Sequence, residues 1–305
     1  MGERSEKIGM GWLRDYPDFR DYTVERKDVS SKLKALNQKD SVRAMLTKMG
    51  VTKASRRTLP SSVDLREWCS PVEDQGSLGS CTANAGVGLL EYFERRAFGR
   101  HIDASRLFLY KVTRNLLHMT GDTGAYLRTT MAAMTLFGVP PAEFWPYDME
   151  KFDEEPPAFC YAFAQSYQAL QYFRLDPLDT TRDALLRRIK TFLAGGLPVM
   201  FGFTVFSSLW DAGTDGKIPF PSEYEKREGG HAVAAVGYDD AIKIENRNRG
   251  GIEITGALLI RNSWSEGWGD SGYGWLPYEY VLNGLAVDWW SLLRNEWVDT
   301  GVFQV

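Results

Sequence analysis

The sequence predicts an α+β protein in which a mainly helical lobe is followed by a mainly β lobe. Apolar residues in the first half recur three or four positions apart, which is the spacing of helices with one buried face. In the second half they form short continuous runs, which are typical of buried strands. A Glu-Pro-Pro break at 155–157 separates the two patterns. Helices that precede strands, instead of alternating with them, indicate two unlike lobes.

The composition is that of an ordinary globular protein. The chain has 305 residues, of which 44% are hydrophobic and 25% are charged. No apolar run approaches the roughly 20 residues that span a bilayer, and the charged N-terminus lacks the apolar region of a secretory signal. We therefore expect a protein that binds neither membranes nor nucleic acid and is either cytoplasmic or exported without a classical signal peptide. We also expect a monomer, although composition does not determine the oligomeric state.

The N-terminal arm, residues 1–59, differs in charge from the rest of the chain. It holds 14 basic and 8 acidic side chains, whereas residues 60–305 hold 22 and 32. A short helix is predicted over 40–49, with Asp40 as its N-cap. Such an arm is either a solvated tail or a pro-segment held on the acidic body by opposite charge. Four aromatic residues predict a cluster too apolar for a free tail: Trp12, Tyr16, Phe19 and Tyr22.

Residues 75–85 place Cys81 at the start of a predicted helix. Apolar residues follow at helical spacing, and Gly99 ends the pattern. Gly76 and Gly79 allow a tight backbone path into the first turn. The positive end of a helix stabilises a thiolate over a thiol, so we expect the pKa of Cys81 to be lowered. The alternative is an inert thiol in the core, the commoner role of a single cysteine.

Further elements follow along the chain from the same patterns. Helices are predicted at 103–115, 127–137 and 181–194, each with an apolar face. Strands are predicted at 169–175 and 198–205, and the second of these is a continuous apolar run. The predicted helix at 181–194 therefore lies between the two predicted strands.

One histidine and one asparagine stand out in the second half. His231, one of three histidines in the chain, begins the apolar strand of 229–238, and Asn262 lies near Trp264 within 258–273. An amide oxygen on an imidazole N–H fixes the tautomer and orientation of the ring, and an imidazolium beside a cysteine stabilises the thiolate. The alternatives are a histidine satisfied in the core and an asparagine that caps a turn.

Three segments resemble papain-like cysteine peptidases. Residues 75–81 (Gln-Gly-Ser-Leu-Gly-Ser-Cys) resemble the nucleophile segment of that family. Residues 59–66 resemble the start of its catalytic domain, and residues 262–273 resemble its Asn-Ser-Trp…Gly-Trp-Gly…Gly-Tyr segment. Leu78 stands in place of a half-cystine and Thr82 in place of an aromatic residue, so the chain lacks one of the family's disulfides and some of its packing.

The resemblance implies a papain-like two-lobe fold. It places a helical left lobe over about 60–165 and an antiparallel, β-barrel-like right lobe over about 166–305, with the active-site cleft between them. The arm of 1–59 is shorter than the helical pro-domains of plant and animal enzymes and is similar to that of bacterial members. By resemblance it is an intramolecular inhibitor, and the protein is made as a zymogen.

The resemblance also assigns a catalytic role to four residues. Cys81 attacks the peptide carbonyl and forms an acyl-thioester, while His231 shuttles the proton and Asn262 orients its ring. Gln75 and the Cys81 N–H stabilise the oxyanion. The implied activity is that of an endopeptidase acting on proteins or peptides.

Five further residues are expected to contact the substrate. By resemblance, the backbone of Gly124 pairs with an extended peptide in the manner of strand addition, and Ala232 forms a subsite wall. Trp264 covers the bond between the histidine and the asparagine, and Trp268 forms a wall on the leaving-group side. A helix-capping loop is the alternative for the turn around 124. The five residues are Gly124, Gly230, Ala232, Trp264 and Trp268.

The two remaining cysteines, Cys69 and Cys160, can form one disulfide at most. Secreted members of the resembled family usually carry several disulfides, so this small number suits a reducing compartment. We expect both residues to be buried thiols.

Other functions are compatible with the same sequence. One is a catalytically inactive binding protein that keeps the fold, and another is an exopeptidase or transferase of the same fold. Residues 267–272 match a dinucleotide-binding pattern, but the segment that follows has the pattern of a strand where that site requires a helix. No metal-binding or phosphate-binding motif is present, so we expect no cofactor and no metal.

Overall fold

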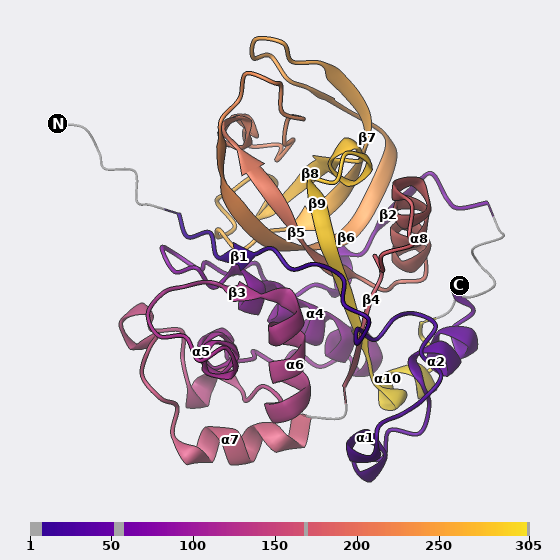
Figure 1. The fold of residues 1–305 in the computed structure, drawn as a ribbon, viewed down its shortest axis with the longest axis vertical. Coiled ribbons are helices and arrows are strands. Elements are labelled where there is room, and N and C mark those ends of the chain that lie inside the picture. Colours follow the sequence, from indigo (N-terminus) through magenta and orange to yellow (C-terminus); the bar gives the residue numbers. More distant parts are fainter. Residues whose placement is uncertain (1–7, 52–57, 168–169, 304–305) are drawn as a thin grey trace.

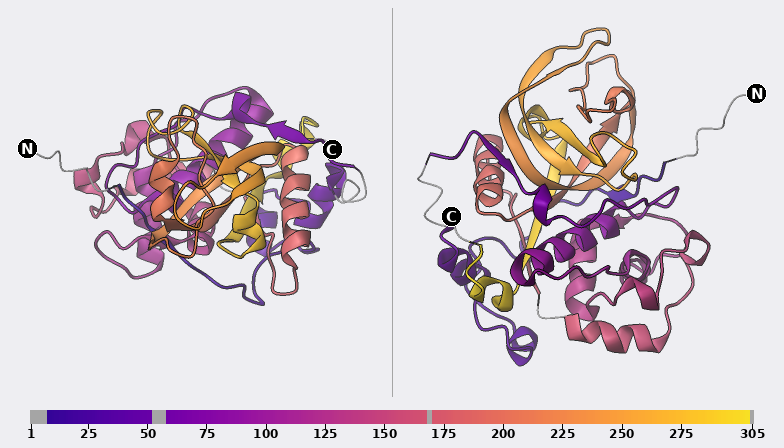
Figure 2. Two further views of the ribbon diagram at one scale, coloured as in Figure 1. Left: turned by 90° about the horizontal axis from the view of Figure 1, so that it is seen from above. Right: turned by 180° about the vertical axis from the view of Figure 1, so that it is seen from behind.

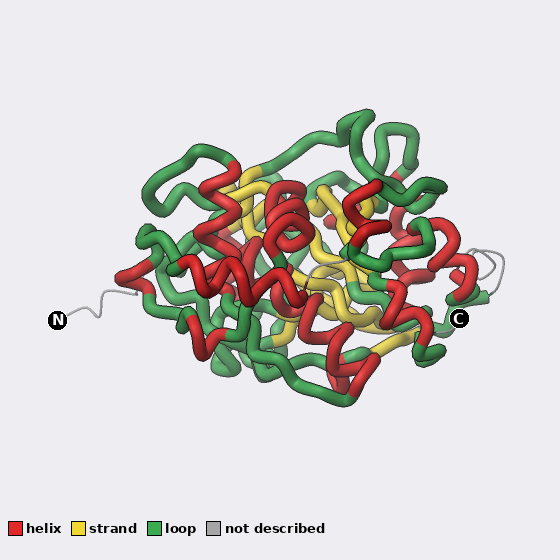
Figure 3. The backbone as a smooth tube through the Cα atoms, turned by 90° about the horizontal axis from the view of Figure 1, so that it is seen from below, coloured by secondary structure: helices red, strands yellow, loops and turns green. Residues whose placement is uncertain are grey.

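The computed structural model describes residues 8–51, 58–167 and 170–303. One half of the molecule is helical and the other is built around a sheet, so the predicted α+β class is confirmed (Figure 1). When the molecule is viewed from the helical end, the helices lie in front of the strands (Figure 3).

The helical half is built around α4 (Cys81–Phe98), which ends at Gly99 in the left-handed conformation with a φ of 66°. Its first fourteen residues are buried, because other helices cover one side and the sheet covers the other. The predicted helices at 81–98, 103–115 and 127–137 are confirmed, and the second begins only after the N-cap Ser105. The surrounding helices are α5 (Arg106–Leu116), α6 (Leu127–Phe137) and α7 (Ala158–Ala164).

The second half is an antiparallel seven-stranded sheet. Its central strand β6 (Arg227–Glu245) pairs with β5, β7 and β2, and shifts of register let it bend. The sheet curls on itself (Figure 1), but its end strands β4 and β8 do not pair along their described residues, so it is an open sheet and not a closed barrel. Its other strands are β4 (Gln171–Arg174), β9 (Ala286–Leu293), β5 (Val199–Phe206), β7 (Glu253–Arg261), β8 (Tyr273–Pro277) and β2 (Ser62–Asp64).

Three helices accompany the sheet. The predicted helix at 181–194 is α8 (Arg182–Ala194), whose N-cap Thr181 accepts a hydrogen bond from Ala184 N–H. Two short helices near the C-terminal end, α9 (Glu279–Leu282) and α10 (Asn295–Asp299), flank β9.

The N-terminal segment is ordered along residues 8–51 and crosses between the two halves (Figure 2). Its strand β1 (Trp12–Leu13) pairs in parallel with β3 (Ala125–Tyr126) of the helical half. Helices α1 (Ser31–Ala35) and α2 (Val42–Lys48) follow along one side of the body. The arm is therefore part of the folded molecule in this state.

Two predictions for this arm need correction. The helix predicted over 40–49 begins after Ser41, whose hydroxyl accepts from Ala44 N–H, because the Asp40 carboxylate is instead engaged by Lys48 and Asn295. The aromatic cluster does not form. Trp12 is buried and Tyr22 is half-buried, but Tyr16 is 68% exposed and Phe19 is 93% exposed.

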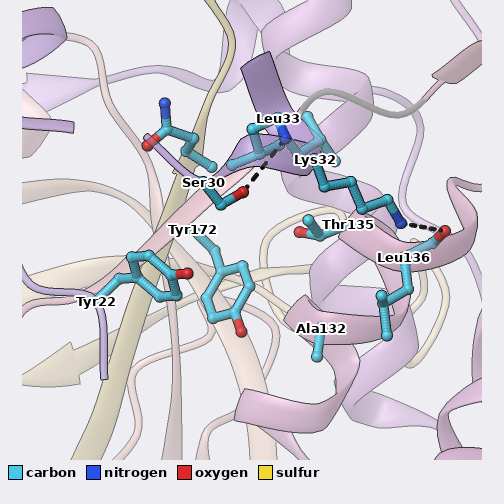
Figure 4. Close-up of a pocket in the computed structure, with 10 residues that line it drawn as sticks. Tyr22, Ser30, Lys32, Leu33, Ala132, Thr135, Leu136 and Tyr172 are labelled. Carbon is cyan, nitrogen blue, oxygen red and sulfur yellow. Dashed lines mark hydrogen bonds between the residues drawn. The ribbon is translucent and has the colours of Figure 1, made fainter. Parts of the chain in front are cut away.

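A small cavity of about 230 Å³ lies between the arm and the body (Figure 4). Leu33 of α1 reaches into it from the arm side, and Lys32 crosses to donate a hydrogen bond to the Leu136 carbonyl, 3.3 Å away. None of the predicted site residues lines this cavity, so it is separate from the site described below. Its lining consists of Tyr22, Ser30, Lys32, Leu33, Ala132, Thr135, Leu136, Leu170, Gln171 and Tyr172.

We expect Leu46→Ala to lower the free energy of unfolding by about 2–5 kcal/mol, because this side chain of α2 is 1% exposed and its loss leaves a cavity. Thr47→Ala, on the exposed face of the same helix, is the matched control and should change it by less than about 0.5 kcal/mol. Urea unfolding followed by circular dichroism measures both. An unchanged midpoint for Leu46→Ala would show that α2 is not part of the cooperative core.

Candidate active site

Cys81 is the first residue of α4 and is fully buried. The preceding loop needs Gly76, whose φ is 58°, in order to turn sharply into the helix. Asn84, one turn into the helix, donates from its side-chain amide to the Ser80 carbonyl at 3.0 Å. These contacts hold the thiol at the end of the helix, where the sequence predicted it.

Side chains of the helical half fix the loop that carries the cysteine. The Asp122 carboxylate accepts from the Gly79 N–H at 2.9 Å and from the Tyr110 hydroxyl at 2.5 Å. The Tyr147 hydroxyl donates to the Gln75 carbonyl at 2.9 Å. Sequence reasoning missed Asp122 and Tyr147, because their only signal is their position in space.

His231 lies within β6, opposite Phe203 of β5, and is fully buried. Its Nε2 is 2.7 Å from Oδ1 of Asn262, which directly follows β7. Because an amide oxygen only accepts, Nε2 must carry the proton, and Nδ1 is left as the basic nitrogen. Nδ1 is buried and has no hydrogen-bond partner among the described residues. The histidine therefore has one nitrogen anchored and the other available.

The thiol and the imidazole lie at the same junction between the two halves. α4 packs against β6, and the backbone N–H of Ala232, the residue after His231, interacts with the Cys81 sulfur. The indole of Trp264 stacks on the imidazole with 4.5 Å between ring centroids and an angle of 25°. The predicted cysteine, histidine and asparagine are thus brought together from three elements.

Gln75 is also buried, and all of its amide atoms are engaged. Its Oε1 accepts from the Ser263 hydroxyl at 2.5 Å. Its Nε2 donates to the Leu78 carbonyl at 2.7 Å and to the Gly9 carbonyl of the arm at 3.0 Å. One donor of the predicted oxyanion site is therefore occupied by the arm.

The arm passes directly over the sulfur. The Gly11 N–H donates to Cys81 Sγ at 3.3 Å, and the Gly11 carbonyl accepts from Ala125 N–H at 2.8 Å. The approach is so close that a Cβ on Gly11 would lie 1.8 Å from the Gly79 carbonyl oxygen. Glycine is therefore required where the arm crosses this loop.

Four of the five residues predicted to contact substrate lie near this crossing or beside the histidine, and the fifth, Trp268, packs against one of these four. A Cβ on Gly124, whose φ is 74°, would lie 2.2 Å from the Gly11 carbonyl oxygen, and one on Gly230 would lie 2.8 Å from the Trp12 ring. Ala232 contacts the sulfur through its N–H, and Trp264 stacks on the imidazole. Trp268 packs edge-on against the Trp264 indole at 5.6 Å.

One aromatic residue near the histidine was not predicted. Trp210 stacks on Trp264 at 5.7 Å and an angle of 20°, and its Nε1 donates to Glu228 at 3.2 Å. Its indole remains 45% exposed, so a row of rings extends from His231 to the surface. No local motif marks Trp210, since it lies in a short 3₁₀ segment far from the histidine in sequence.

Burial keeps both reactive groups neutral in this state. Desolvation raises the pKa of the Cys81 thiol to about 11, although nearby backbone N–H groups favour the thiolate. Desolvation also lowers the pKa of His231 to about 4, against the hydrogen bond to Asn262, which raises it. The lowered thiol pKa that the sequence predicted is wrong for this covered state, because loss of water outweighs the helix terminus.

Within the described part of the chain, no group of three or more His, Cys, Asp or Glu residues could hold a metal ion. Cys69 and Cys160 are free and buried, as the sequence predicted. No helix in the described segments is long and apolar enough to cross a membrane.

A cysteine at the start of a helix in one half, packed against the strand of the other half that carries a histidine hydrogen-bonded to an asparagine, is the arrangement of a two-lobed cysteine protease. The family described as papain family cysteine protease matches residues 59–283, so the chain belongs to that family.

Two relatives agree with this assignment. A peptidase C1-like protein of Acanthamoeba polyphaga mimivirus, L477, is 37% identical over 225 residues, which cover 72% of this chain and 68% of that protein. The crystal structure of xylellain, a cysteine protease from Xylella fastidiosa, superposes with a TM-score of 0.69 and 31% identity, and the match covers 96% of this chain and 99% of the other. Procathepsin L 3 of Tenebrio molitor shares the fold, with a TM-score of 0.57 and 20% identity over 78% of this chain and 71% of the other.

We expect iodoacetamide to modify Cys81 of the full-length protein slowly at pH 7, with a rate that rises roughly tenfold per pH unit toward pH 10. A pKa raised to about 11 leaves little thiolate at neutral pH, and each unit of pH below the pKa reduces the thiolate tenfold. Mass spectrometry of the peptide that contains Cys81 gives the rate, and the urea-unfolded protein is the control. Rapid modification that is independent of pH between 6 and 9 would show that the thiolate already exists.

Proposed function

We propose that this papain-family cysteine protease is an endopeptidase that cleaves peptide bonds through an acyl-thioester on Cys81. The observation that carries the proposal is the buried, unpartnered Nδ1 of His231, which the bond from Nε2 to Asn262 leaves free, in a strand whose next residue, Ala232, interacts with the Cys81 sulfur through its N–H. A base whose other nitrogen is anchored is what activation of a thiol requires.

In the proposed reaction, His231 Nδ1 accepts the thiol proton of Cys81, and the sulfur attacks the carbonyl carbon of the peptide. The imidazolium then gives this proton to the leaving nitrogen, and water hydrolyses the acyl-thioester with the histidine again acting as base. Asn262 keeps the ring aligned throughout without adding charge. Trp264, stacked on the imidazole, excludes water from that hydrogen bond.

Oxyanion stabilisation is assigned to Gln75 and the Cys81 N–H. The first N–H groups of a helix have no intrahelical partner, so the Cys81 N–H is suited to a developing negative charge. The Gln75 amide is held in place by Ser263, and the N–H that now binds the Gly9 carbonyl becomes available to substrate when the arm leaves. The arm thus uses a donor that the reaction needs.

We further propose that the N-terminal arm is an intramolecular inhibitor and that the protein is a zymogen. The arm engages the thiol through Gly11, the oxyanion donor through Gly9, and the backbone at Ala125. At the sulfur it presents an N–H and not a carbonyl carbon, so the arm lies in the cleft in a form that the thiol does not attack.

Ion pairs anchor the arm in a way that net charge did not predict. Asp15 and Asp21 of the basic arm pair with Arg128 of the acidic body, with 2.7 Å between Asp21 Oδ1 and the Arg128 guanidinium. Asp21 also lies 3.4 Å from the buried Arg174. Local acidic groups of the arm, and not its overall positive charge, make these contacts.

The peptidase activity is tested on full-length Gly11→Ala, whose new Cβ would overlap the Gly79 carbonyl and displace the arm. We expect this variant to cleave internal bonds of fluorogenic peptides with blocked ends, because the thiol and the Gln75 donor become accessible. Adding Cys81→Ala should reduce the rate at least about 10³-fold, since no nucleophile remains. Equal rates with and without Cys81 would refute the proposal, and cleavage restricted to unblocked ends would indicate an exopeptidase.

Inhibition by the arm predicts a second result. An epoxide reagent at pH 7 should modify Cys81 at least about tenfold faster in Gly11→Ala than in the unmodified full-length protein, because rehydration lets the thiol and imidazole ionise. Phe19→Ala is the control, since this ring belongs to the same arm but is 93% exposed. If Gly11→Ala and Phe19→Ala react equally slowly, the arm does not protect the thiol.

A further inference from the structure

The side chain of Trp12 fills a pocket in the sheet immediately beside the thiol. Its indole is 6% exposed and lies against Gly202 of β5 and Gly230 of β6, two positions where any Cβ would overlap the ring. A Cβ on Gly202 would be only 1.9 Å from the indole, and one on Gly230 would be 2.8 Å from it. The two glycines therefore make room for a large planar group.

Asp288 of β9 forms the polar end of this pocket. Its Oδ2 accepts from Trp12 Nε1 at 3.1 Å, and its Oδ1 accepts from Trp290 Nε1 at 2.7 Å. Asp288 is fully buried and its φ is 65°, a backbone conformation that aspartate tolerates better than most residues. Its N–H donates to Asp176 at 2.8 Å, which helps to fix the backbone. The carboxylate is thus held in place, with Oδ2 directed at the Trp12 indole N–H.

The negative charge of Asp288 is compensated by residues of the body and not by a basic residue of the arm. Arg174 lies 3.3 Å from Asp288 and 2.9 Å from Asp176, and Arg128 interacts with Asp288 at longer range. Arg128 itself pairs with Asp15 and Asp21 of the arm, so Arg174 is the guanidinium that directly contacts both carboxylates. Burial raises the pKa of Asp288 to about 6, so the group is ionised at neutral pH but poorly solvated. A neutral N–H donor satisfies it, whereas a further cation would be buried without a partner of its own.

The pocket is placed to contact a substrate. Gly11 donates to the sulfur, and the adjacent Trp12 enters the pocket, so the pocket is one residue along an extended chain from the thiol. When the arm leaves, the cavity and the free Oδ2 of Asp288 become available to whatever peptide replaces it.

We propose that, in the peptidase described above, this is the specificity pocket and that Asp288 makes it select a tryptophan side chain of the substrate. The inference rests on the proposed function and goes beyond it, because it names the recognised group. Phenylalanine fills the space but leaves Oδ2 without a donor, and arginine would bury a second guanidinium beside a carboxylate that already pairs with Arg174. A site built around an N–H donor discriminates strongly against analogues that lack it.

The decisive comparison varies the side chain of the substrate and keeps the body residues that line the pocket unchanged. Full-length protein carrying both Gly11→Ala and Trp12→Ala, with the arm displaced and the pocket emptied, is assayed with blocked fluorogenic peptides. These carry tryptophan, 3-benzothienylalanine, phenylalanine or arginine at each of the two positions before the scissile bond. Benzothienylalanine has the shape of tryptophan but has sulfur in place of the N–H. At one of the positions we expect kcat/KM to be about 10- to 100-fold higher for tryptophan than for its isostere.

Two pocket variants in the same background complete the test. Asp288→Asn should reduce the preference for tryptophan over benzothienylalanine to less than about threefold. Gly202→Ala should lower kcat/KM for tryptophan peptides at least about tenfold while sparing control peptides that carry alanine at the same position. Modification of Cys81 by an epoxide verifies that each variant is folded. Turnover with no preference for tryptophan over its isostere in the parent would overturn this inference alone, whereas absence of turnover for every peptide would overturn the proposed function and the inference with it.

Discussion

The protonation states of Cys81 and His231 depend on the exclusion of water from both side chains. Where the arm crosses at Gly11, the thiol is fully enclosed apart from its contacts with backbone N–H groups, so burial raises its pKa and lowers that of the histidine. Separating charge between the two groups is then unfavourable, because neither ion is solvated. The two groups are thus held in their neutral forms by a segment of the arm that covers them.

The arm combines a part suited to release with a part that belongs to the core. Around the thiol it is held by backbone hydrogen bonds and ion pairs and by the buried side chain of Trp12. Further along, Val42, Met45 and Leu46 of α2 are buried to 1% exposure or less. Opening the first part does not require unfolding of the second, and local opening of this kind costs less than global unfolding. Removal of all residues up to 59 would instead uncover an apolar face.

The sequence predicted most of the helices and the segments that carry the candidate site, because both have local signals. The helix at Cys81 follows from periodicity and Gly99, and Asn262 follows from a short motif of distinctive spacing. The path of the arm could not be predicted, since β1 pairs with a strand more than a hundred residues away. Asp288 and Trp210 likewise have no motif around them and gain their surroundings only through folding.

If the arm inhibits and the pocket recognises substrate as proposed, one carboxylate connects inhibition to recognition. While the arm is bound, Trp12 supplies a donor to Asp288, and departure of the arm leaves a buried ionised oxygen without that donor. This cost opposes opening, because an unpaired buried acceptor is expensive. A substrate that carries an indole removes the same cost and therefore competes with the arm for one oxygen atom. The residue that stabilises the closed state would then also favour the peptide that replaces the arm, so latency and specificity would not be independent properties of this fold.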